Sequence, residues 1–269
     1  MSAGTVVLVG CGQMGSAMLR GWLQSGAASR YVIIEPAGVP EPFASLSHVE
    51  AHGAASELDD ALAPDAVVFA VKPQVMSDIV PAYRRFVRPE TVFMSIAAGT
   101  TIANLAKHLG DAAMVRVMPN TPAAIGRAIS VACANPRVTA AQRQLCDALL
   151  AAIGESTWVE DEGLLDAVTA VSGSGPAYVF LLIETLAAAG VQAGLPPQLA
   201  ARLALATVAG SGELARVSHE TPARLRENVT SPGGTTRAAL DVLMGEEGMA
   251  QLMERAVAAA TRRSRELAG

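Results

Sequence analysis

TVVLVGCGQMGSA, residues 5–17, is the stretch that decides the fold of this chain. It opens with a compact β-branched run, which predicts a buried strand, and a helical pattern begins at Met14. Gly10, Gly12 and Gly15 fit the spacing G-x-G-x-x-G, directly after the strand and directly before the helix. Alone the spacing is a weak signal, but in this context it is typical of a turn that binds the pyrophosphate of a dinucleotide.

Each glycine of this turn has a separate expected role. The first allows a tight turn, the second lets the pyrophosphate approach the backbone, and the third lets the helix sit close to the sheet. The free N–H groups and the positive end of the helix dipole then hold the phosphates. The alternative is a purely structural connection between strand and helix. The expected cofactor contacts are Gly10, Cys11, Gly12, Gln13, Met14 and Gly15.

Glu35 ends the second expected strand, where dinucleotide sites place an acidic residue. Its carboxylate could bind both ribose hydroxyls of NAD and would repel a 2′-phosphate. The segment EPAGVPEP, which starts at Glu35, contains no Arg or Lys to hold such a phosphate. The residues therefore favour NADH over NADPH. The alternative is that Glu35 is a solvated loop residue.

Two later segments follow expected strands, at the edge where doubly wound sheets bind ligands. AVKPQ, residues 70–74, contains Lys72, which could meet the cofactor through its charge or through its backbone. SIAAG, residues 95–99, has small side chains that would let nicotinamide come close, although small residues also serve plain packing. The expected contacts here are Ala70, Val71, Lys72, Pro73, Ala97 and Ala98.

The first part of the chain alternates between strand-like and helix-like segments. This alternation predicts βαβ units around a mainly parallel, doubly wound sheet, so the fold class is α/β. A short helix at 56–62 is expected because Ser56 and Asp59 are placed for a variant of the capping box. The expected strands are 5–10, 31–35, 66–71, 91–97, 113–118 and 129–134, and the longer helices are 14–24 and 139–152.

After STWVE, residues 156–160, the strand signals stop and helical patterns take over. We therefore expect a dinucleotide-binding domain at 1–160 and an all-helical domain at 161–269. No linker rich in Ser or Gly marks the boundary, so direct packing of the two parts is expected. The helical patterns cover 164–194, 198–217, 222–228, 236–244 and 249–267.

The composition of the 269-residue chain argues against several classes of function. The chain is 51% apolar and 17% charged, which is typical of a large core and not of disorder. Its net charge of −5 argues against a nucleic-acid partner. The three scattered cysteines show no metal-binding spacing, so we expect reduced thiols, no metal and a cytoplasmic location.

The most membrane-like stretch is residues 167–201. Glu184 and the GSGP at 173–176 interrupt it, so no apolar span of roughly twenty residues remains. We expect a buried core or a subunit interface there and no membrane partner.

Six motifs together resemble the pyrroline-5-carboxylate reductase family. They cover the chain in order, and SGSGPAY and TSPGGTT are the specific ones. The resemblance implies a Rossmann-like domain followed by a helical domain that interlocks with a partner subunit, and a higher homo-oligomer such as a ring of dimers. It also implies NADPH- or NADH-dependent reduction of 1-pyrroline-5-carboxylate to proline. The motifs are VGCGQMG (9–15), AVKPQ (70–74), SIAAG (95–99), RVMPNTP (116–122), VSGSGPAYVF (171–180) and ENVTSPGGTTRAAL (227–240).

The SPGGTT loop offers a carboxylate site without a basic side chain. Gly233 and Gly234 form a bare turn and a helix starts near Thr235. The unpaired N–H groups and the dipole of that helix favour an anion. Ser231, Thr235 and Thr236 add hydroxyl donors. The alternative is an ordinary turn between helices.

The resemblance assigns further roles in the helical half. Thr235 and Thr236 would hold the substrate carboxylate through their N–H groups, and the Thr236 hydroxyl would meet the ring nitrogen. Asn228 and Glu162 fall at matching positions; Glu162 would stabilise the cationic nitrogen or merely cap a helix. Thr236 and Glu162 are thus the expected catalytic residues. Because a pyrroline imine is basic enough to arrive protonated, catalysis rests on orientation and electrostatics, and no proton donor is assigned.

Gly173 and Gly175 would let the first long helix pass close to nicotinamide or substrate, or would serve tight helix crossing. Three other functions stay open. A reductase of another cyclic imine would use the same pocket. A β-hydroxyacid dehydrogenase relies on a Lys in the helical half, and no Lys follows Lys107. A non-catalytic dinucleotide sensor would not need the carboxylate site.

Overall fold

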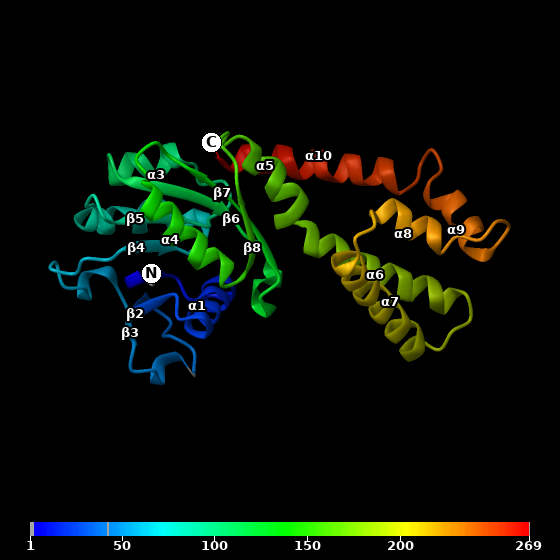
Figure 1. Cartoon of the computed structure of the whole chain (residues 1–269), viewed down its shortest axis with the longest axis horizontal. Coiled ribbons are helices and arrows are strands. Elements are labelled where there is room, and N and C mark those ends of the chain that lie inside the picture. The colour runs from blue at the N-terminus through cyan, green and yellow to red at the C-terminus, as the bar shows by residue number, and fades with distance from the viewer. Residues whose placement is uncertain (1–2, 42, 269) are drawn as a thin grey trace. The chain divides into compact units, whose positions relative to one another are not determined.

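The computed structural model describes residues 3–41 and 43–268, which form two compact units (Figure 1). The first unit runs up to Gly173 and also includes the C-terminal segment from Ala260. The second unit is Ser174–Ala259. The chain therefore leaves the first unit after Gly173 and returns to it at Ala260.

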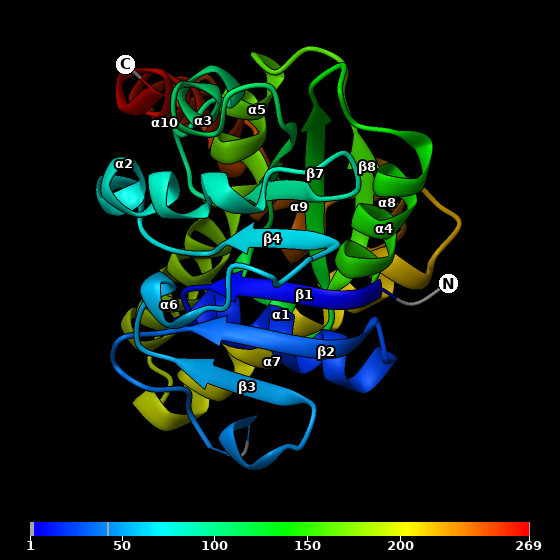
Figure 2. The same ribbon diagram turned by 90° about the vertical axis from the view of Figure 1, so that its left-hand side faces the viewer.

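The first unit is built on one eight-stranded sheet with the strand order β3-β2-β1-β4-β5-β6-β7-β8. Figure 2 shows β3, β2, β1 and β4 side by side in that order. All neighbouring strands are parallel except β6 and β7, so the prediction of a mainly parallel, doubly wound sheet is confirmed. The strands are β1 Ala3–Val9, β2 Ala28–Ile34, β3 Val49–His52, β4 Ala66–Phe69, β5 Val92–Ser95, β6 Ala113–Met118, β7 Ala128–Ala134 and β8 Gly154–Trp158.

Helices cover both faces of the sheet because alternate residues of each strand point to opposite sides. Helices α1 and α4 pack on one face, and η4 and α3 pack on the other. The helical segments of this unit are α1 Gln13–Ser25, η1 Phe43–Ser45, η2 Ala55–Glu57, η3 Pro73–Val75, α2 Met76–Ile79, η4 Val80–Phe86, α3 Ile102–Leu109, η5 Thr121–Ile125, α4 Ala140–Ala151, α5 Leu164–Val168 and the π-helical η6 Thr169–Gly173.

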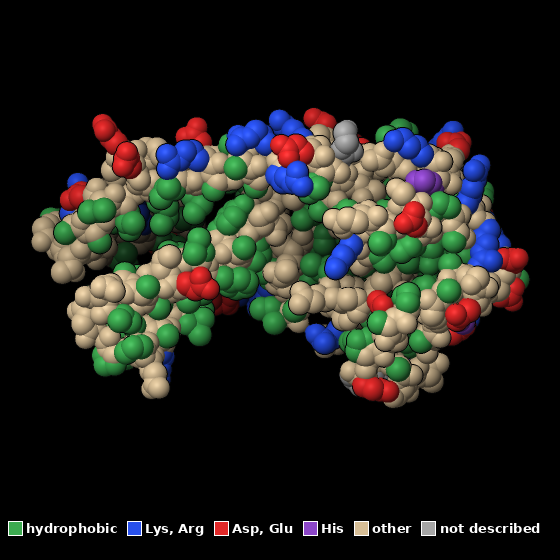
Figure 3. Space-filling model, turned by 180° about the vertical axis from the view of Figure 1, so that it is seen from behind, with side chains coloured by type: hydrophobic (Ala, Val, Ile, Leu, Met, Phe, Trp, Pro, Cys, Tyr) green, Lys and Arg blue, Asp and Glu red, His purple; other side chains and the backbone are tan. Residues whose placement is uncertain are grey.

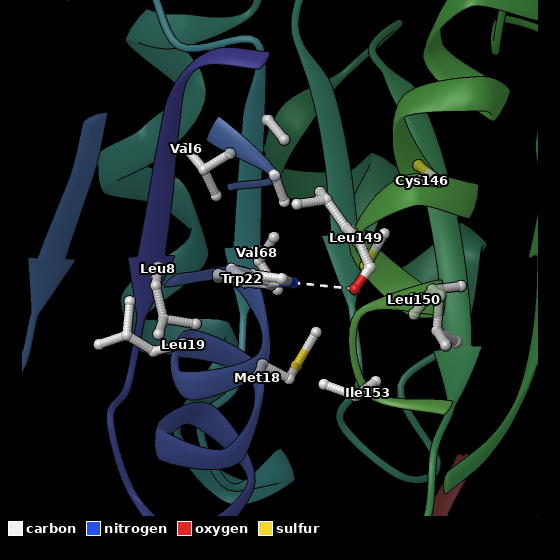
Figure 4. Packing of buried hydrophobic residues seen from close by; sticks show 14 of the residues in the cluster. Val6, Leu8, Met18, Leu19, Trp22, Val68, Cys146, Leu149, Leu150 and Ile153 are labelled. Carbon is white, nitrogen blue, oxygen red and sulfur yellow. Dashed lines mark hydrogen bonds between the residues drawn. The ribbon is translucent and has the colours of Figure 1, made fainter. Parts of the chain in front are cut away.

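The core on the α1 side is centred on Trp22, which is fully buried (Figure 4). Val6 and Leu8 of β1 pack with it, while Val7 and Val9 belong to the core on the other face. The Trp22 indole Nε1 donates a hydrogen bond of 2.9 Å to the carbonyl oxygen of Leu149. A buried indole N–H needs such a partner, and this bond ties α1 to α4.

The prediction of a helix at 56–62 is wrong. The structure has only the short 3-10 segment η2, and Asp59 Oδ1 accepts the Ala61 N–H at 2.8 Å in a local turn. The Asp59 side chain thus competes with helical hydrogen bonding, as short polar side chains do. Strand β3 and helix α3 were not predicted.

The second unit is entirely helical, as predicted. The segment expected as one helix at 164–194 is interrupted in the structure by η6 and by a bend at Ser174. The helices are α6 Gly175–Gln192, α7 Pro197–Val217, α8 Pro222–Asn228, α9 Thr235–Leu243 and α10 Met249–Ala268, whose last part belongs to the first unit.

Helix α6 leaves many apolar side chains exposed, and Figure 3 shows such side chains gathered over the helical unit at the left of the view. Phe180, for example, is 59% exposed. By length and composition alone, one described helical stretch, Leu164–Gln192, could cross a membrane. The exposed large hydrophobic residues of α6 are Val179, Phe180, Leu181, Leu182, Leu186 and Val191.

The last strand ends at Trp158, close to the predicted end of the strand region. Helix α5 and segment η6 follow it but belong to the first compact unit. The division of function between residues 1–160 and 161–269 therefore stays a prediction.

Candidate functional site

The glycine turn after β1 has the geometry that its spacing predicts. Gly10 has φ +93°, and a Cβ there would lie 2.7 Å from Val71 Cγ1. A Cβ on Gly15 would lie 2.2 Å from the Gly10 carbonyl oxygen, so only glycine lets the helix come this close. A Cβ on Gly12 would have no neighbour within 4 Å. The turn is thus tight at its first and third glycines and open at the second, where a phosphate needs room.

Helix α1 begins in this turn without a side-chain cap. Gly12 is the N-cap residue, makes no capping hydrogen bond, and no acidic residue occupies the first turn. The first-turn N–H groups of a helix have no acceptor within the helix. The start of α1, at Gln13 and Met14, therefore offers unpaired donors and the positive end of the dipole to an anion.

Glu35 lies directly against the glycine turn. Its Oε2 accepts the Cys11 N–H at 2.8 Å, and its Oε1 accepts the Ala37 N–H at 3.2 Å. The carboxylate is therefore held beside the turn, and its contact with the ribose hydroxyls stays a prediction. Burial raises the pKa of the Cys11 thiol, and the nearby Glu35 carboxylate also raises it, so this thiol is neutral at physiological pH.

The loops after β4 and β5 follow the turn along the same edge of the sheet. The Ala70 N–H donates to the Val9 carbonyl oxygen at 2.7 Å, and the Ile96 N–H donates to the Phe69 carbonyl oxygen at 3.1 Å. Ala97 is buried, and Ser95 Oγ accepts its N–H at 3.3 Å. The predicted cofactor residues from all three loops are thus brought to the carboxyl ends of adjacent parallel strands, where such sheets bind ligands.

Lys72 is exposed at the carboxyl end of β4, and Pro73 begins η3 there. The strand itself ends at Phe69, before the position predicted from Pro73.

Glu162 is part of a polar cluster in the first unit. Its Oε1 accepts the Ile102 N–H at the start of α3 at 2.8 Å and a hydrogen bond from Arg116 Nη1 at 3.1 Å. Glu162 therefore does cap a helix, but the helix is α3 and not α5, which follows it in sequence. No hydrogen bond to Glu162 Oε2 occurs among residues 3–41 and 43–268.

The SPGGTT loop, in the second unit, leads into α9. Gly233 has φ +68°, and Gly234 is the N-cap of α9 without a side-chain cap. The Gly234 N–H donates to the Ser231 carbonyl oxygen at 3.1 Å, which closes the turn. Thr235 and Thr236 are the first two residues of the helix, so their N–H groups have no acceptor within it.

The structure does not bring every predicted substrate residue to this turn. Asn228 Nδ2 donates to Glu220 Oε2 at 2.8 Å, so its amide is engaged elsewhere. Glu162 lies in the first unit with the cofactor residues, whereas Asn228, Ser231 and Thr236 lie in the second.

Gly173 serves tight packing within the first unit. A Cβ there would lie 2.3 Å from Met118 Cε, whereas a Cβ on Gly175 would meet nothing within 4 Å. Arg116, the residue that pairs with Glu162, is a further site residue that was not predicted from the sequence. The available signal was a single charged residue within the apolar run AMVRVM. Among the described residues, no group of three or more His, Cys, Asp and Glu side chains could hold a metal ion.

The open glycine turn, the acidic residue at the end of β2 and the strand order define a Rossmann-type, dinucleotide-dependent oxidoreductase. A family model described as NADP oxidoreductase, coenzyme F420-dependent, matches residues 5–99. A second model, described as pyrroline-5-carboxylate reductase dimerisation, matches residues 162–267. The chain belongs to the pyrroline-5-carboxylate reductase family, because proteins of that name are similar to it over its whole length.

Pyrroline-5-carboxylate reductase of Pseudomonas aeruginosa is 38% identical over 269 residues, which is 100% of this chain and 98% of the relative. The Pisum sativum enzyme of the same name is 38% identical over 98% of this chain and 96% of the relative. A crystal structure of Plasmodium falciparum pyrroline carboxylate reductase with NADP bound has a TM-score of 0.84 at 28% identity, covering 100% of both chains. The Coxiella burnetii enzyme has a TM-score of 0.85 at 30% identity, covering 98% of both chains.

Proposed function

We propose that this protein reduces 1-pyrroline-5-carboxylate to proline by hydride transfer from NADH or NADPH. The observation that carries the proposal is the full-length similarity to enzymes named for that reaction, together with an open dinucleotide turn at Gly12. The reaction needs a hydride donor against the imine carbon, an anchor for the carboxylate, and support for positive charge on nitrogen.

The first unit would supply the hydride donor. The pyrophosphate would sit at the open turn before α1, and the nicotinamide would lie over the small residues Ala97 and Ala98. Fixing the nicotinamide ring against the imine carbon lowers the barrier through orientation. The nicotinamide would supply a hydride to the imine carbon, and the C=N π electrons would become the lone pair of the amine nitrogen.

The start of α9 would supply the anchor. The N–H groups of Thr235 and Thr236 and the dipole of α9 would hold the carboxylate, with Ser231 as a further donor. Backbone donors suit this task because they are fixed by the helix and need no reorganisation when substrate binds. The Thr236 hydroxyl would accept a hydrogen bond from the protonated ring nitrogen.

Glu162 has a different proposed part. Both of its hydrogen bonds are on Oε1, and the two donors belong to a guanidinium and a helix N-terminus. These partners offset much of its charge, so we assign Glu162 mainly to holding α3 in place. Its Oε2 would supply the remaining support for the cationic nitrogen.

NADH is the proposed preferred cofactor. The carboxylate of Glu35 is held beside the glycine turn by two backbone N–H groups, at the position where it would meet the ribose hydroxyls. A 2′-phosphate at that position would face an anion, and residues 35–42 contain no Arg or Lys to offset it.

The helical half carries the homo-oligomer, since the dimerisation model covers it. A ring of dimers is our proposal for the larger assembly. We also propose a cytoplasmic location, which the three buried free cysteines support, since a reducing compartment leaves thiols unpaired.

Steady-state kinetics with both cofactors, against 1-pyrroline-5-carboxylate and its six-membered homologue, test the function. We expect turnover of the five-membered imine, with higher kcat/KM than the homologue. No turnover with either imine would favour a dinucleotide sensor, and preference for the homologue would favour a reductase of another cyclic imine.

The Thr236→Ala variant tests the site. We expect a lower kcat/KM by about tenfold or more, because a hydrogen bond to a charged group contributes about 1.5–3 kcal/mol. Thr230→Ala is the matched control, since the Thr230 hydroxyl donates to the Arg226 carbonyl oxygen instead. Equal kinetics for wild type and Thr236→Ala would refute the site assignment without refuting the reaction.

A further inference from the structure

Arg116 is a charged residue in the middle of a buried strand. It lies on β6 and is 5% exposed. A buried guanidinium is costly unless it is paired and hydrogen-bonded. Its partners therefore show what it does.

Two carboxylates share the Arg116 guanidinium. Nη1 contacts Glu162 Oε1 at 3.1 Å, and Nη2 contacts Asp166 Oδ1 at 3.8 Å. Each carboxylate holds a second element of the same unit.

The first partner fixes the start of α3. Glu162 Oε1 also accepts the Ile102 N–H at 2.8 Å. Ile102 is the first residue of α3 and directly follows loop 96–101, which joins β5 to this helix. The Arg116–Glu162 pair therefore fixes the far end of that loop.

The second partner fixes the end of α10. Asp166 Oδ1 accepts a hydrogen bond of 2.7 Å from Ser264 Oγ. One turn further on, α10 passes directly over Gly99 in the middle of loop 96–101. A Cβ on Gly99, which has φ +73°, would lie 2.9 Å from Leu267 Cβ. The Arg116–Asp166 pair therefore supports the middle of the same loop.

The near end of loop 96–101 is fixed beside Arg116 as well. Ser95 pairs in register with Arg116 across β5 and β6, and its hydroxyl accepts the Ala97 N–H at 3.3 Å. Ala97 and Ala98, the two residues that we place under the nicotinamide, lie in this loop.

We propose that Arg116 is a positioning residue for the nicotinamide, acting through Glu162 and Asp166 on loop 96–101. The inference rests on the proposed placement of the cofactor over Ala97 and Ala98. Arg116 does not touch the cofactor itself. It keeps the loop at the distance and angle that the nicotinamide half of the cofactor requires, while the pyrophosphate half binds at the glycine turn independently of it.

The test compares two ligands that differ only in the nicotinamide. NADH spans the glycine turn and loop 96–101, whereas ADP-ribose lacks the nicotinamide and reaches only the first. For Arg116→Met we expect the Kd of NADH to rise about tenfold or more, since a hydrogen bond to the Glu162 carboxylate and an ion pair with Asp166 are removed. The Kd of ADP-ribose should change less than about twofold, which is within ordinary non-additivity of distant sites.

Two further variants should raise the Kd of NADH by smaller factors than Arg116→Met. Arg116→Lys keeps the charge with a single donor group and should recover part of the NADH affinity. Ser264→Ala removes one of the two contacts that tie α10 to Asp166, since Arg265 Nε also lies 3.9 Å from Asp166 Oδ2, and it should raise the NADH Kd by a smaller factor. The matched control is Arg143→Met, because Arg143 also pairs with a carboxylate, Glu160, at 3.8 Å but lies on α4. It should leave both dissociation constants unchanged.

An equal rise in the two dissociation constants would overturn the proposal, because it would indicate a general defect of the fold. Unchanged NADH affinity in Arg116→Met would overturn it as well. If Arg116→Met does not fold, the dissociation constants of NADH and ADP-ribose are compared in Arg116→Lys and Ser264→Ala instead, and the same two outcomes would overturn the proposal. The readout is cofactor binding, so failure of the proposed reaction, seen as absent turnover by the wild type, is distinguishable from failure of this inference.

Discussion

Replacing Glu35 by glutamine removes one negative charge beside the glycine turn and changes the side-chain shape very little. In the structure the carboxylate accepts N–H groups from Cys11 at 2.8 Å and from Ala37 at 3.2 Å. A glutamine oxygen still accepts one such bond, so the turn should stay folded. The variant therefore isolates the electrostatic effect of the carboxylate on a 2′-phosphate.

The size of this effect follows from Coulomb's law. Two unit charges about 5 Å apart interact by about 3 kcal/mol at an effective dielectric constant of about 20. Glu35 is half-buried at the edge of the sheet, so salt and water reduce this value. We therefore take the remaining repulsion as about 1.5 kcal/mol. Its removal corresponds to about a tenfold rise in kcat/KM for NADPH.

The assay is kcat/KM for NADPH and for NADH at fixed, moderate salt, with 1-pyrroline-5-carboxylate saturating. We expect Glu35→Gln to raise the NADPH/NADH ratio about tenfold, and Glu35→Ser to raise it further because NADH also loses the acceptor for its ribose hydroxyls. High salt should shrink the effect.

The matched control is Asp65→Asn. Asp65 Oδ2 also accepts a backbone N–H, from Thr5 at 2.8 Å, but at the amino end of β1, away from the glycine turn. Its replacement should leave the cofactor ratio unchanged. If the ratio is the same in Glu35→Gln, Glu35→Ser and wild type, the carboxylate does not face the ribose and the preference for NADH has no basis in this residue.

Three other predictions concern stability and assembly. Gly15→Ala should lower the free energy of unfolding by about 1–3 kcal/mol, because its Cβ would lie 2.2 Å from the Gly10 oxygen; an unchanged urea midpoint would contradict this. Burial raises the pKa of Cys146 from 9.0 to about 12, so between these values the unfolded chain loses the proton first and stability falls as pH rises. From pH 8 to about 10 the free energy of unfolding should fall by about 1.4 kcal/mol more in the wild type than in Cys146→Ala. Urea unfolding at both pH values measures this difference, and equal losses in the two proteins would contradict the prediction. Phe180→Glu, on exposed α6, should shift the oligomer toward monomer in sedimentation, and an intact oligomer would exclude Phe180 from the interface.

Most of the sheet could be predicted because its strands are short apolar runs bounded by turn residues. Strand β3 could not, since its residues Val49–His52 are only half-buried at the sheet edge and show no clean alternation. Helix α3 has only eight residues, although its cap signal is present: Thr101 accepts the Asn104 N–H. The predicted helix at 56–62 failed because Asp59 bonds locally.

The glycine turn was predictable because Gly10 and Gly15 lie where a Cβ would clash, while Gly12 leaves open space for a phosphate. The contact between Glu35 and the Cys11 N–H was not, because it joins positions far apart in the chain. Arg116 was missed for a related reason. A charge within an apolar strand signals a buried partner, but only the three-dimensional structure identifies that partner as Glu162.

Helix α6 is apolar around most of its circumference, and its side chains are largely exposed in the single chain. We expect a second copy to cover this surface, because the dimerisation model matches residues 162–267, and association would then be coupled to folding. The midpoint of unfolding should therefore rise with protein concentration. Dilution alone would then lower the stability of the helical half, so a melting temperature has meaning only together with the protomer concentration at which it was measured.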